Sequence, residues 1–426
     1  LILTLFVNTA QAQKYGLLWS YETDGWVESV AISSDGSYIA AGGDKVYLFD
    51  KKGNLLWSYK IYVNSVSISS DGSYIAAADA GRNSKVYLFD RKGNLLWNKS
   101  CGRVWSVSIS SDGSYIAAGG GDNKVYLFDR KGNLLWSYET DDRVSSVAIS
   151  SDGSYIAAGS WHYDGIWSYD RSKEDYKVYL FDREGNLLWS YETDDDVWSV
   201  AISSDGSYIA AEGDKVYLFD KKGNLLWNKS CGWDVRSVAI SSDGSYIAAG
   251  SDYKVCLFDR EGNLLWSYKT GYDVWSVAIS SDSSYIAAGS WDDKVYLFDR
   301  EGNLLWSYER SYETDRHVES VAISSDGSCI CIAAGSWDDK EVFYLFASVQ
   351  VIIENVKEAI SSERGKGYNV EEAESVLSQA EQAFSAGDYA EAKELAYRAK
   401  ALALDIDQDG VPNDSDFAPT IKNIYV

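Results

Sequence analysis

The stretch SSDGSYIAAGGDKVYLFDKKGNLLW, residues 33–57, decides the fold, because its parts recur along most of the chain. The aspartate of its SSDGS segment has counterparts spaced 36 to 53 residues apart, at positions 35, 71, 112, 152, 205, 243, 282 and 326. The LLW segment also occurs eight times. Repeats of about 40 residues are typical of propellers and solenoids.

Each repeat contains four short apolar runs, which in the first copy cover residues 27–33, 38–41, 45–50 and 55–59. The runs are rich in Val, Ile, Tyr, Phe and Trp, and turn residues separate them, which is the pattern of strands. Four antiparallel strands make one propeller blade. The chain opens on a fourth-strand fragment, 17–21, and its repeats end on a third strand, 342–346. The sequence therefore predicts an all-β eight-bladed propeller of four-stranded antiparallel blades, in which the N-terminal strand closes the last blade.

Two segments resemble known repeat families. SWDDKVYLFD at 290–299 resembles the WD repeat, and LFDRKGNLLW at 88–97 is similar to the tryptophan-docking repeat of pyrroloquinoline-quinone-type (PQQ-like) propellers. The resemblance implies a propeller but no particular activity, because propellers carry many unrelated functions. The Gly-His dipeptide of WD repeats is absent and the third strand ends in Phe-Asp, so the hydrogen-bonded tetrad of that family is not carried over.

The sequence divides into four parts. Residues 1–12 end in an Ala-x-Ala pattern and are interpreted as the remnant of a secretory signal peptide, with a buried strand as the alternative. Residues 13–347 form the propeller. Residues 348–404 show helical periodicity and are expected to form a small three-helix α-helical module, and 405–426 form a tail. We expect a secreted or cell-surface protein.

The tail contains a candidate calcium loop. Oxygen ligands at loop positions one, three, five, seven and twelve, with glycine at six, match a Ca²⁺ site, and DQDGVPNDSD resembles thrombospondin type 3 and dockerin loops. A solvated acidic linker is the alternative. The expected ligands are Asp405, Asp407, Asp409, Asp416 and the carbonyl of Val411. Calcium is the one cofactor expected, and no organic cofactor is.

The composition limits the classes of partner. With 39 basic and 64 acidic side chains, the net charge is −25, which argues against nucleic acid as a partner. The chain has only 2 histidines and 5 cysteines. Cys101 and Cys231 occupy equivalent positions in distant blades, and Cys329 and Cys331 are two apart, so free thiols and no disulfide are expected.

The repeats differ mainly in two loops on one face, between strands four and one and between strands two and three. The first strand of each copy has the pattern Val-x-Ser-Val, in which the valines and the serine are constant and the residue x varies. This favours contact of x with a partner over packing in the core, and neutral drift is the alternative. The x residues are Glu28, Asn64, Trp105, Ser145, Trp198, Arg236, Trp275 and Glu319. Trp161, Trp167 and Trp291 lie on the same face.

These features favour a non-catalytic extracellular or cell-surface scaffold that presents a variable, acidic, tryptophan-rich face to a protein, peptide or glycan. The C-terminal module is expected to mediate attachment to the cell envelope. One alternative is a structural cell-envelope component. A second is a quinoprotein-like dehydrogenase or a glycan-active enzyme, but no vicinal cysteine pair and no distinct carboxylate pair supports it.

Overall fold

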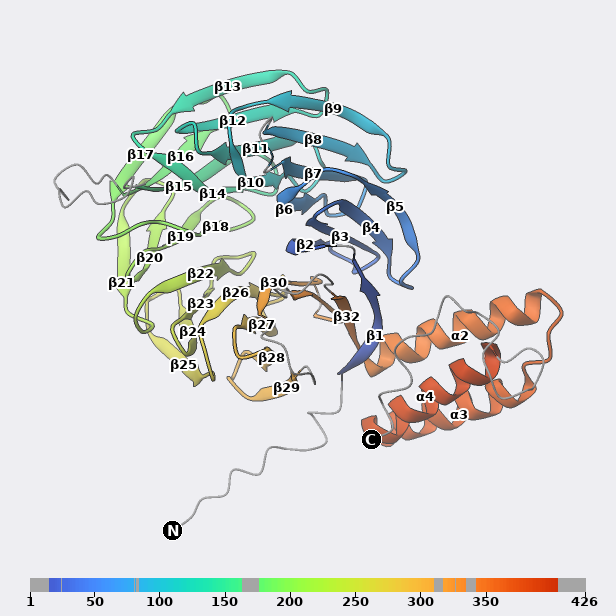
Figure 1. Ribbon diagram of the computed structural model, residues 1–426. Helices are drawn as coiled ribbons and strands as arrows, with labels where there is room; N and C mark the ends of the chain where they lie inside the picture. Colours follow the sequence, from blue (N-terminus) through green and yellow to red (C-terminus); the bar gives the residue numbers. More distant parts are fainter. Residues whose placement is uncertain are drawn as a thin grey trace, which may run out of the picture. The chain divides into compact units, whose positions relative to one another are not determined.

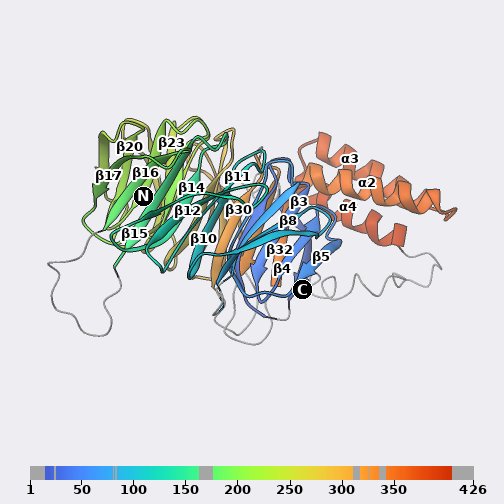
Figure 2. The ribbon, with the colours of Figure 1, turned by 90° about the horizontal axis from the view of Figure 1, so that it is seen from above.

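The computed structural model describes residues 15–404, apart from 24, 80, 82–83, 163–175, 310–316, 326 and 335–341. It contains strands in repeating sets of four, followed by three helices (Figures 1 and 2). The chain divides into two compact units, a propeller unit of 21–303 and 307–343 and a helical unit of 1–20, 304–306 and 344–426.

Within each set, consecutive strands pair antiparallel. The first strands are β2 (Val27–Ile32), β6 (Val63–Ile68), β10 (Val104–Ile109), β14 (Arg143–Ile149), β18 (Val200–Ile202), β22 (Val235–Ile240), β26 (Val274–Ile279) and β30 (Val318–Ile323). The second strands are β3 (Tyr38–Gly43), β7 (Tyr74–Asp79), β11 (Tyr115–Gly120), β15 (Tyr155–Trp161), β19 (Tyr208–Glu212), β23 (Tyr246–Ser251), β27 (Tyr285–Ser290) and β31 (Cys329–Ala334).

The third strands carry the VYLFD segments and are β4 (Val46–Asp50), β8 (Lys85–Asp90), β12 (Lys124–Asp129), β16 (Lys177–Asp182), β20 (Val216–Asp220), β24 (Lys254–Asp259), β28 (Lys294–Asp299) and β32 (Val342–Ser348). The fourth strands are β5 (Leu55–Tyr59), β9 (Leu95–Ser100), β13 (Leu134–Glu139), β17 (Leu187–Glu192), β21 (Leu225–Lys229), β25 (Leu264–Lys269), β29 (Leu304–Glu309) and β1 (Tyr15–Glu22).

The number of complete blades differs from the expected eight. Seven blades, β2–β5 through β26–β29, consist of four consecutive strands and belong to the propeller unit, residues 304–306 of β29 apart. The last repeat has no fourth strand of its own, because the chain enters helix α2 directly after β32. Its sheet has the order β1-β32-β31-β30, and most of β1 and β32 is assigned to the helical unit. The propeller unit is therefore corrected to seven complete blades plus β30 and β31.

The first strands lie on the inner side of the propeller (Figure 1) and are joined by a repeated hydrogen bond. The serine of each Val-x-Ser-Val segment accepts the backbone N–H of the second valine in the next repeat. Eight such bonds of 3.0–3.2 Å form a closed circle, which β30 completes through Ser320 and Val30 on one side and Ser276 and Val321 on the other.

The turn between the first and second strands explains the SSDGS segment. The carboxylate of Asp35 accepts hydrogen bonds from the Ser33 hydroxyl and from the backbone and side chain of Ser37, at 2.7–3.0 Å. Gly36 has φ +69°, which glycine adopts without steric cost. The same bonds recur at Asp71, Asp112, Asp152, Asp205 and Asp243.

The LLW tryptophans pack between blades, as the sequence predicted. Trp57 donates its indole N–H to the Arg91 carbonyl of the next blade at 3.0 Å, and its ring lies 5.3 Å from the Phe89 ring. A Cβ on Gly93 would lie 2.7 Å from the Trp57 ring, so the KGN turn needs glycine there. Packing between blades therefore accounts for a tryptophan at this position in every repeat.

The helical unit contains α2 (Val349–Gly365), α3 (Glu371–Ser385) and α4 (Tyr389–Leu404), and so the expected C-terminal helical module is present. Ser348 caps α2, and Asp388 accepts the Glu391 N–H at 3.0 Å at the start of α4. Tyr397 of α4 donates its hydroxyl to the Leu17 carbonyl of β1 at 2.7 Å. No helix among the described residues is long and apolar enough to cross a membrane.

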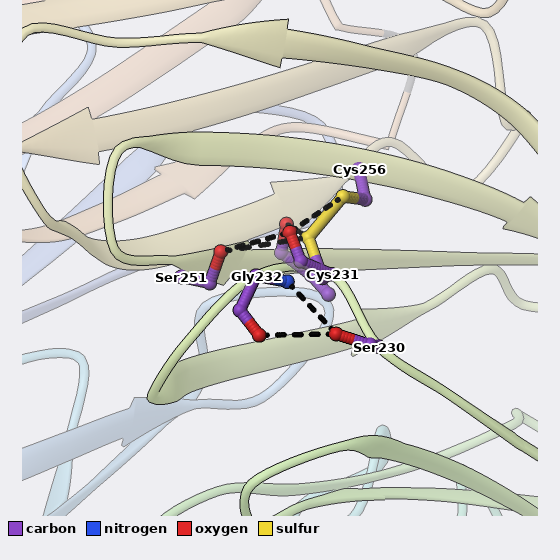
Figure 3. The surroundings of a disulfide bond; sticks show 6 residues. Ser230, Cys231, Gly232, Ser251 and Cys256 are labelled. Atoms are coloured by element: carbon purple, nitrogen blue, oxygen red, sulfur yellow. Dashed lines mark hydrogen bonds between the residues drawn. A yellow bond between two sulfur atoms is a disulfide. The ribbon is translucent and has the colours of Figure 1, made fainter.

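One cysteine prediction was wrong. Cys231 and Cys256 form a disulfide with a Cα–Cα distance of 6.0 Å (Figure 3). The repeat pattern relates Cys231 only to its counterpart in a distant blade. Cys231 lies in the connection from β21 to β22, between two blades, and Cys256 lies beside it on β24 of the second of these blades. Cys101 and Cys329 are buried, and burial raises the pKa of the Cys101 thiol to about 12.

The serine circle generates a stability prediction. Ser276→Ala would leave the Val321 N–H without its acceptor, and an unsatisfied buried N–H costs about 1–3 kcal/mol. We expect Ser276→Ala to lower the free energy of unfolding by this amount in urea denaturation. The exposed Ser58→Ala control should change it by less than about 0.5 kcal/mol. Equal effects of both substitutions would show that the circle does not stabilise the propeller.

The aspartate turns generate a pH prediction. Burial raises the pKa of Asp243, but hydrogen bonds from Ser245 and Ser241 outweigh it and the net pKa is below the ordinary value. The stability from this carboxylate is therefore present above its unfolded pKa of about 3.9 and is lost as pH falls through its folded pKa. Asp243→Asn should lower Tm at pH 7, and the difference from the parent should shrink below about pH 4. A difference in Tm that is constant from pH 7 to 3 would contradict this interpretation.

Candidate binding surface

The variable position x of the first strand is the extra residue of a β-bulge. The pairing of first and second strands shifts register between the first valine and the serine in seven of the eight repeats. In the remaining repeat, residue 198 precedes the paired strand β18. A bulge leaves one residue outside the ladder and redirects its side chain. The fold thus explains why this one position can vary while its neighbours stay constant.

Three of the predicted tryptophans form one aromatic cluster. The Trp105 and Trp161 rings lie 5.4 Å apart, and the Trp161 and Trp198 rings lie 4.7 Å apart. The Arg143 guanidinium lies 5.9 Å from the Trp105 ring and 5.7 Å from the Trp161 ring. We call these four residues the first stack. They come from three successive blades, and Trp198 is 48% exposed.

A second stack spans the next three repeats. Trp275 and Trp291 stack in parallel at 4.3 Å, and Trp291 stacks on His317 at 4.4 Å. The Arg236 guanidinium covers Trp275 at 4.9 Å. The sequence analysis identified Arg236, Trp275 and Trp291 but missed His317. No repeat pattern marked that position, because the sequence that precedes His317 differs in length and composition from the corresponding segments of the other repeats.

Arg236 connects the second stack to acidic side chains. Its guanidinium lies 3.5 Å from Asp234, 3.6 Å from Asp273 and 4.0 Å from Asp252. Burial raises the pKa of Asp252, and the charges of Asp273 and Asp234 add to this effect. One cation therefore faces three carboxylates, and the local charge is negative.

A buried carboxyl group lies behind Trp198. Glu212 occupies the position of Gly42, Gly119 and Gly159 in other repeats and is fully buried. It accepts the Trp198 backbone N–H at 2.5 Å, and burial raises its pKa well above the ordinary value. The sequence analysis missed Glu212, although it is the one carboxylate among glycines and alanine at this repeat position.

Asp196 and His162 lie on the same side of the propeller as Trp198. Asp196 accepts the His162 backbone N–H at 2.9 Å, and the His162 ring bonds to Asp142. Burial raises the pKa of Asp196 to about 6. These bonds fix the loops that carry the first stack.

The other x residues are not part of either stack. Burial raises the pKa of Glu319 to about 7, and the charge of Glu28 in the neighbouring repeat contributes. Glu28 accepts the Tyr62 hydroxyl at 3.1 Å. The Ser145 hydroxyl donates hydrogen bonds to the Gly159 and Val197 carbonyls. Asn64 lies half-buried on β6.

Several predicted site residues lie outside the described part of the chain. They are Trp167 and the calcium ligands Asp405, Asp407, Asp409, Val411 and Asp416. Calcium binding and secretion stay predictions. Within the described ranges, no group of three or more His, Cys, Asp or Glu side chains is arranged to hold a metal ion.

Solved structures with a similar fold include Sqt1 from Chaetomium thermophilum. Sqt1 bound to the N-terminus of the ribosomal protein L10 aligns with a TM-score of 0.63 and 17% identity, over 77% of this chain and 98% of Sqt1. A second Sqt1 structure gives a TM-score of 0.64 and 17% identity, over 78% and 100% of the two chains. At this identity the similarity shows the fold alone.

Family models match the repeats directly. The WD domain, G-beta repeat, matches residues 185–220. No curated protein matches the chain. The model described as "Family of unknown function (DUF5711)" matches residues 8–166 and 205–349, which is more than half of the chain. The chain therefore belongs to the family of unknown function DUF5711.

Proposed function

We propose that this protein is a non-catalytic scaffold whose variable face binds a cationic peptide segment of a partner protein. The observation that carries the proposal is the pair of aromatic stacks, each of which contains two residues at the variable position x. A repeat protein that used this position only for packing would repeat one residue there, as it does with the neighbouring valine and serine.

The charge of the face favours a cationic partner. The Asp141, Asp194 and Asp234 side chains are 55%, 59% and 65% exposed. Together with the net charge of −25, they create a negative potential that attracts basic segments. Exposed tryptophan adds apolar area and a ring face for a cation, and both are common at binding hot spots.

A peptide is favoured over a glycan by the comparisons. WD-type propellers serve as protein-binding scaffolds, and the similar propeller Sqt1 was solved with the N-terminus of a ribosomal protein. Extended segments of a partner are a natural fit for such a face, because loops on a rigid scaffold supply the specificity.

The test uses the full chain and fluorescence anisotropy with labelled dodecapeptides rich in Arg, Lys and aromatic residues, against acidic peptides of equal length. We expect the cationic peptides to bind and to weaken as salt rises. Trp198→Ala should lower affinity about 30-fold, which corresponds to a hot-spot loss of about 2 kcal/mol. Its Tm should stay close to the parent value, because half of this side chain is already exposed.

Trp26→Ala is the matched control, because Trp26 is 45% exposed but belongs to neither stack. It should bind the cationic peptides like the parent. Failure of every cationic peptide to bind, or equal losses in both variants, would overturn the proposal.

A further inference from the structure

Aromatic pairs fill the outer part of the interface between neighbouring blades. The last tyrosine of a fourth strand lies against the tyrosine of the VYLFD segment in the next blade. Five interfaces have this pair, at ring distances of 5.6–6.4 Å: Tyr21–Tyr47, Tyr59–Tyr87, Tyr138–Tyr179, Tyr191–Tyr217 and Tyr268–Tyr296. The pair is therefore the regular filling of this space.

The interface between the β18–β21 blade and the β22–β25 blade lacks both rings. Lys229 occupies the position of Tyr191, and Cys256 occupies the position of Tyr217. In a related interface, Lys99 replaces the first ring but Tyr126 keeps the second. Loss of both rings removes a large volume that the disulfide only partly fills.

The partner of the tyrosine hydroxyl has also changed. In the preceding blade, the Tyr217 hydroxyl donates to Asp194 at 3.1 Å, and Lys215 pairs with the same carboxylate at 2.7 Å. The residue equivalent to Asp194 in the next blade is Gly232. Gly232 directly follows Cys231 of the disulfide, and its carbonyl accepts the Ser230 hydroxyl at 3.0 Å (Figure 3).

A pocket of about 710 Å³ is present at this interface. Cys231, Cys256 and Leu264 line it, and so does Trp233, whose side chain is 85% exposed. Asp195 and Asp214 also line it, and a carboxylate can accept a hydrogen bond from a hydroxyl. The volume lies within the range of small-ligand sites.

We propose that this pocket binds a phenol ring supplied from outside the chain. The ring takes the space that tyrosine fills in the other blades, lies against Trp233 and Leu264, and donates its hydroxyl to Asp195 or Asp214. The tyrosines of the other interfaces show that the space between two blades accepts such a ring, and Tyr217 shows that a carboxylate can accept its hydroxyl. No residue of the two stacks lines the pocket, although Asp234, which pairs with Arg236, does. The proposal does not depend on the proposed peptide binding.

The probes are N-acetyl-tyrosinamide, which imitates a tyrosine side chain of a partner, and 4-methylphenol, which is a free phenol. Saturation-transfer NMR and titration calorimetry on the full chain should detect millimolar binding of at least one probe. Binding of the amide alone would show that the pocket binds a tyrosine side chain of a partner. Equal binding of both probes would show that a free phenol is sufficient for binding. Binding of neither overturns the proposal.

The decisive variant refills the pocket. Cys231→Thr with Cys256→Tyr restores the residue types of the preceding blade and should reduce probe binding at least tenfold. Trp233→Ala tests the site without touching the core, and should weaken binding by a similar factor at unchanged Tm. Cys101→Thr and Trp26→Ala are the matched controls and should bind like the parent. Binding that persists in both the refilled and the Trp233→Ala variants would place the phenol elsewhere and overturn the proposal.

Discussion

The closed circle of serine-to-valine hydrogen bonds is the constraint on which the rest of the propeller depends. Each bond ties the first strand of one repeat to the first strand of the next, so every repeat must be present at the right angle for the circle to close. β30 takes part through Ser320 and Ser276. Closure at the innermost strands fixes the positions of the blades, and the outer packing adds to it.

This circle also explains where variation is tolerated. The serine hydroxyl and the valine N–H of each first strand are committed to the neighbouring repeat, and the residue between the first valine and the serine lies in a bulge. Substitution at the bulge leaves both hydrogen bonds intact. Trp105, Trp275 and Arg236 therefore occupy positions where side chains can change without cost to closure, and there they form the two stacks. The variable residue that can contact a partner therefore lies next to the serine that closes the circle.

The outer parts of the blade interfaces also combine a constant structural feature with a local exception. Most interfaces are filled by a pair of tyrosines, which contributes apolar contact and a hydrogen bond to an aspartate. One interface has lost the pair and gained a disulfide between Cys231 and Cys256, which holds the loop that the tyrosine would otherwise support. The tyrosine pair can be absent from this interface because the disulfide replaces part of the stabilisation that the pair supplies elsewhere.

The sequence by itself determined that the chain forms an all-β propeller of four-stranded blades, the role of the LLW tryptophans and the C-terminal helical module, but its prediction of eight blades was wrong. It could do so because equivalent residues make the same hydrogen bonds and packing contacts in each repeat. Asp35 and Trp57, for example, have counterparts in the other copies. The tertiary structure alone decided the number of complete blades, the Cys231–Cys256 bond, the contact of Glu212 with Trp198 and the place of His317 in the second stack. These depend on residues that occur once, and on which side chains meet when strands far apart in the chain are brought together.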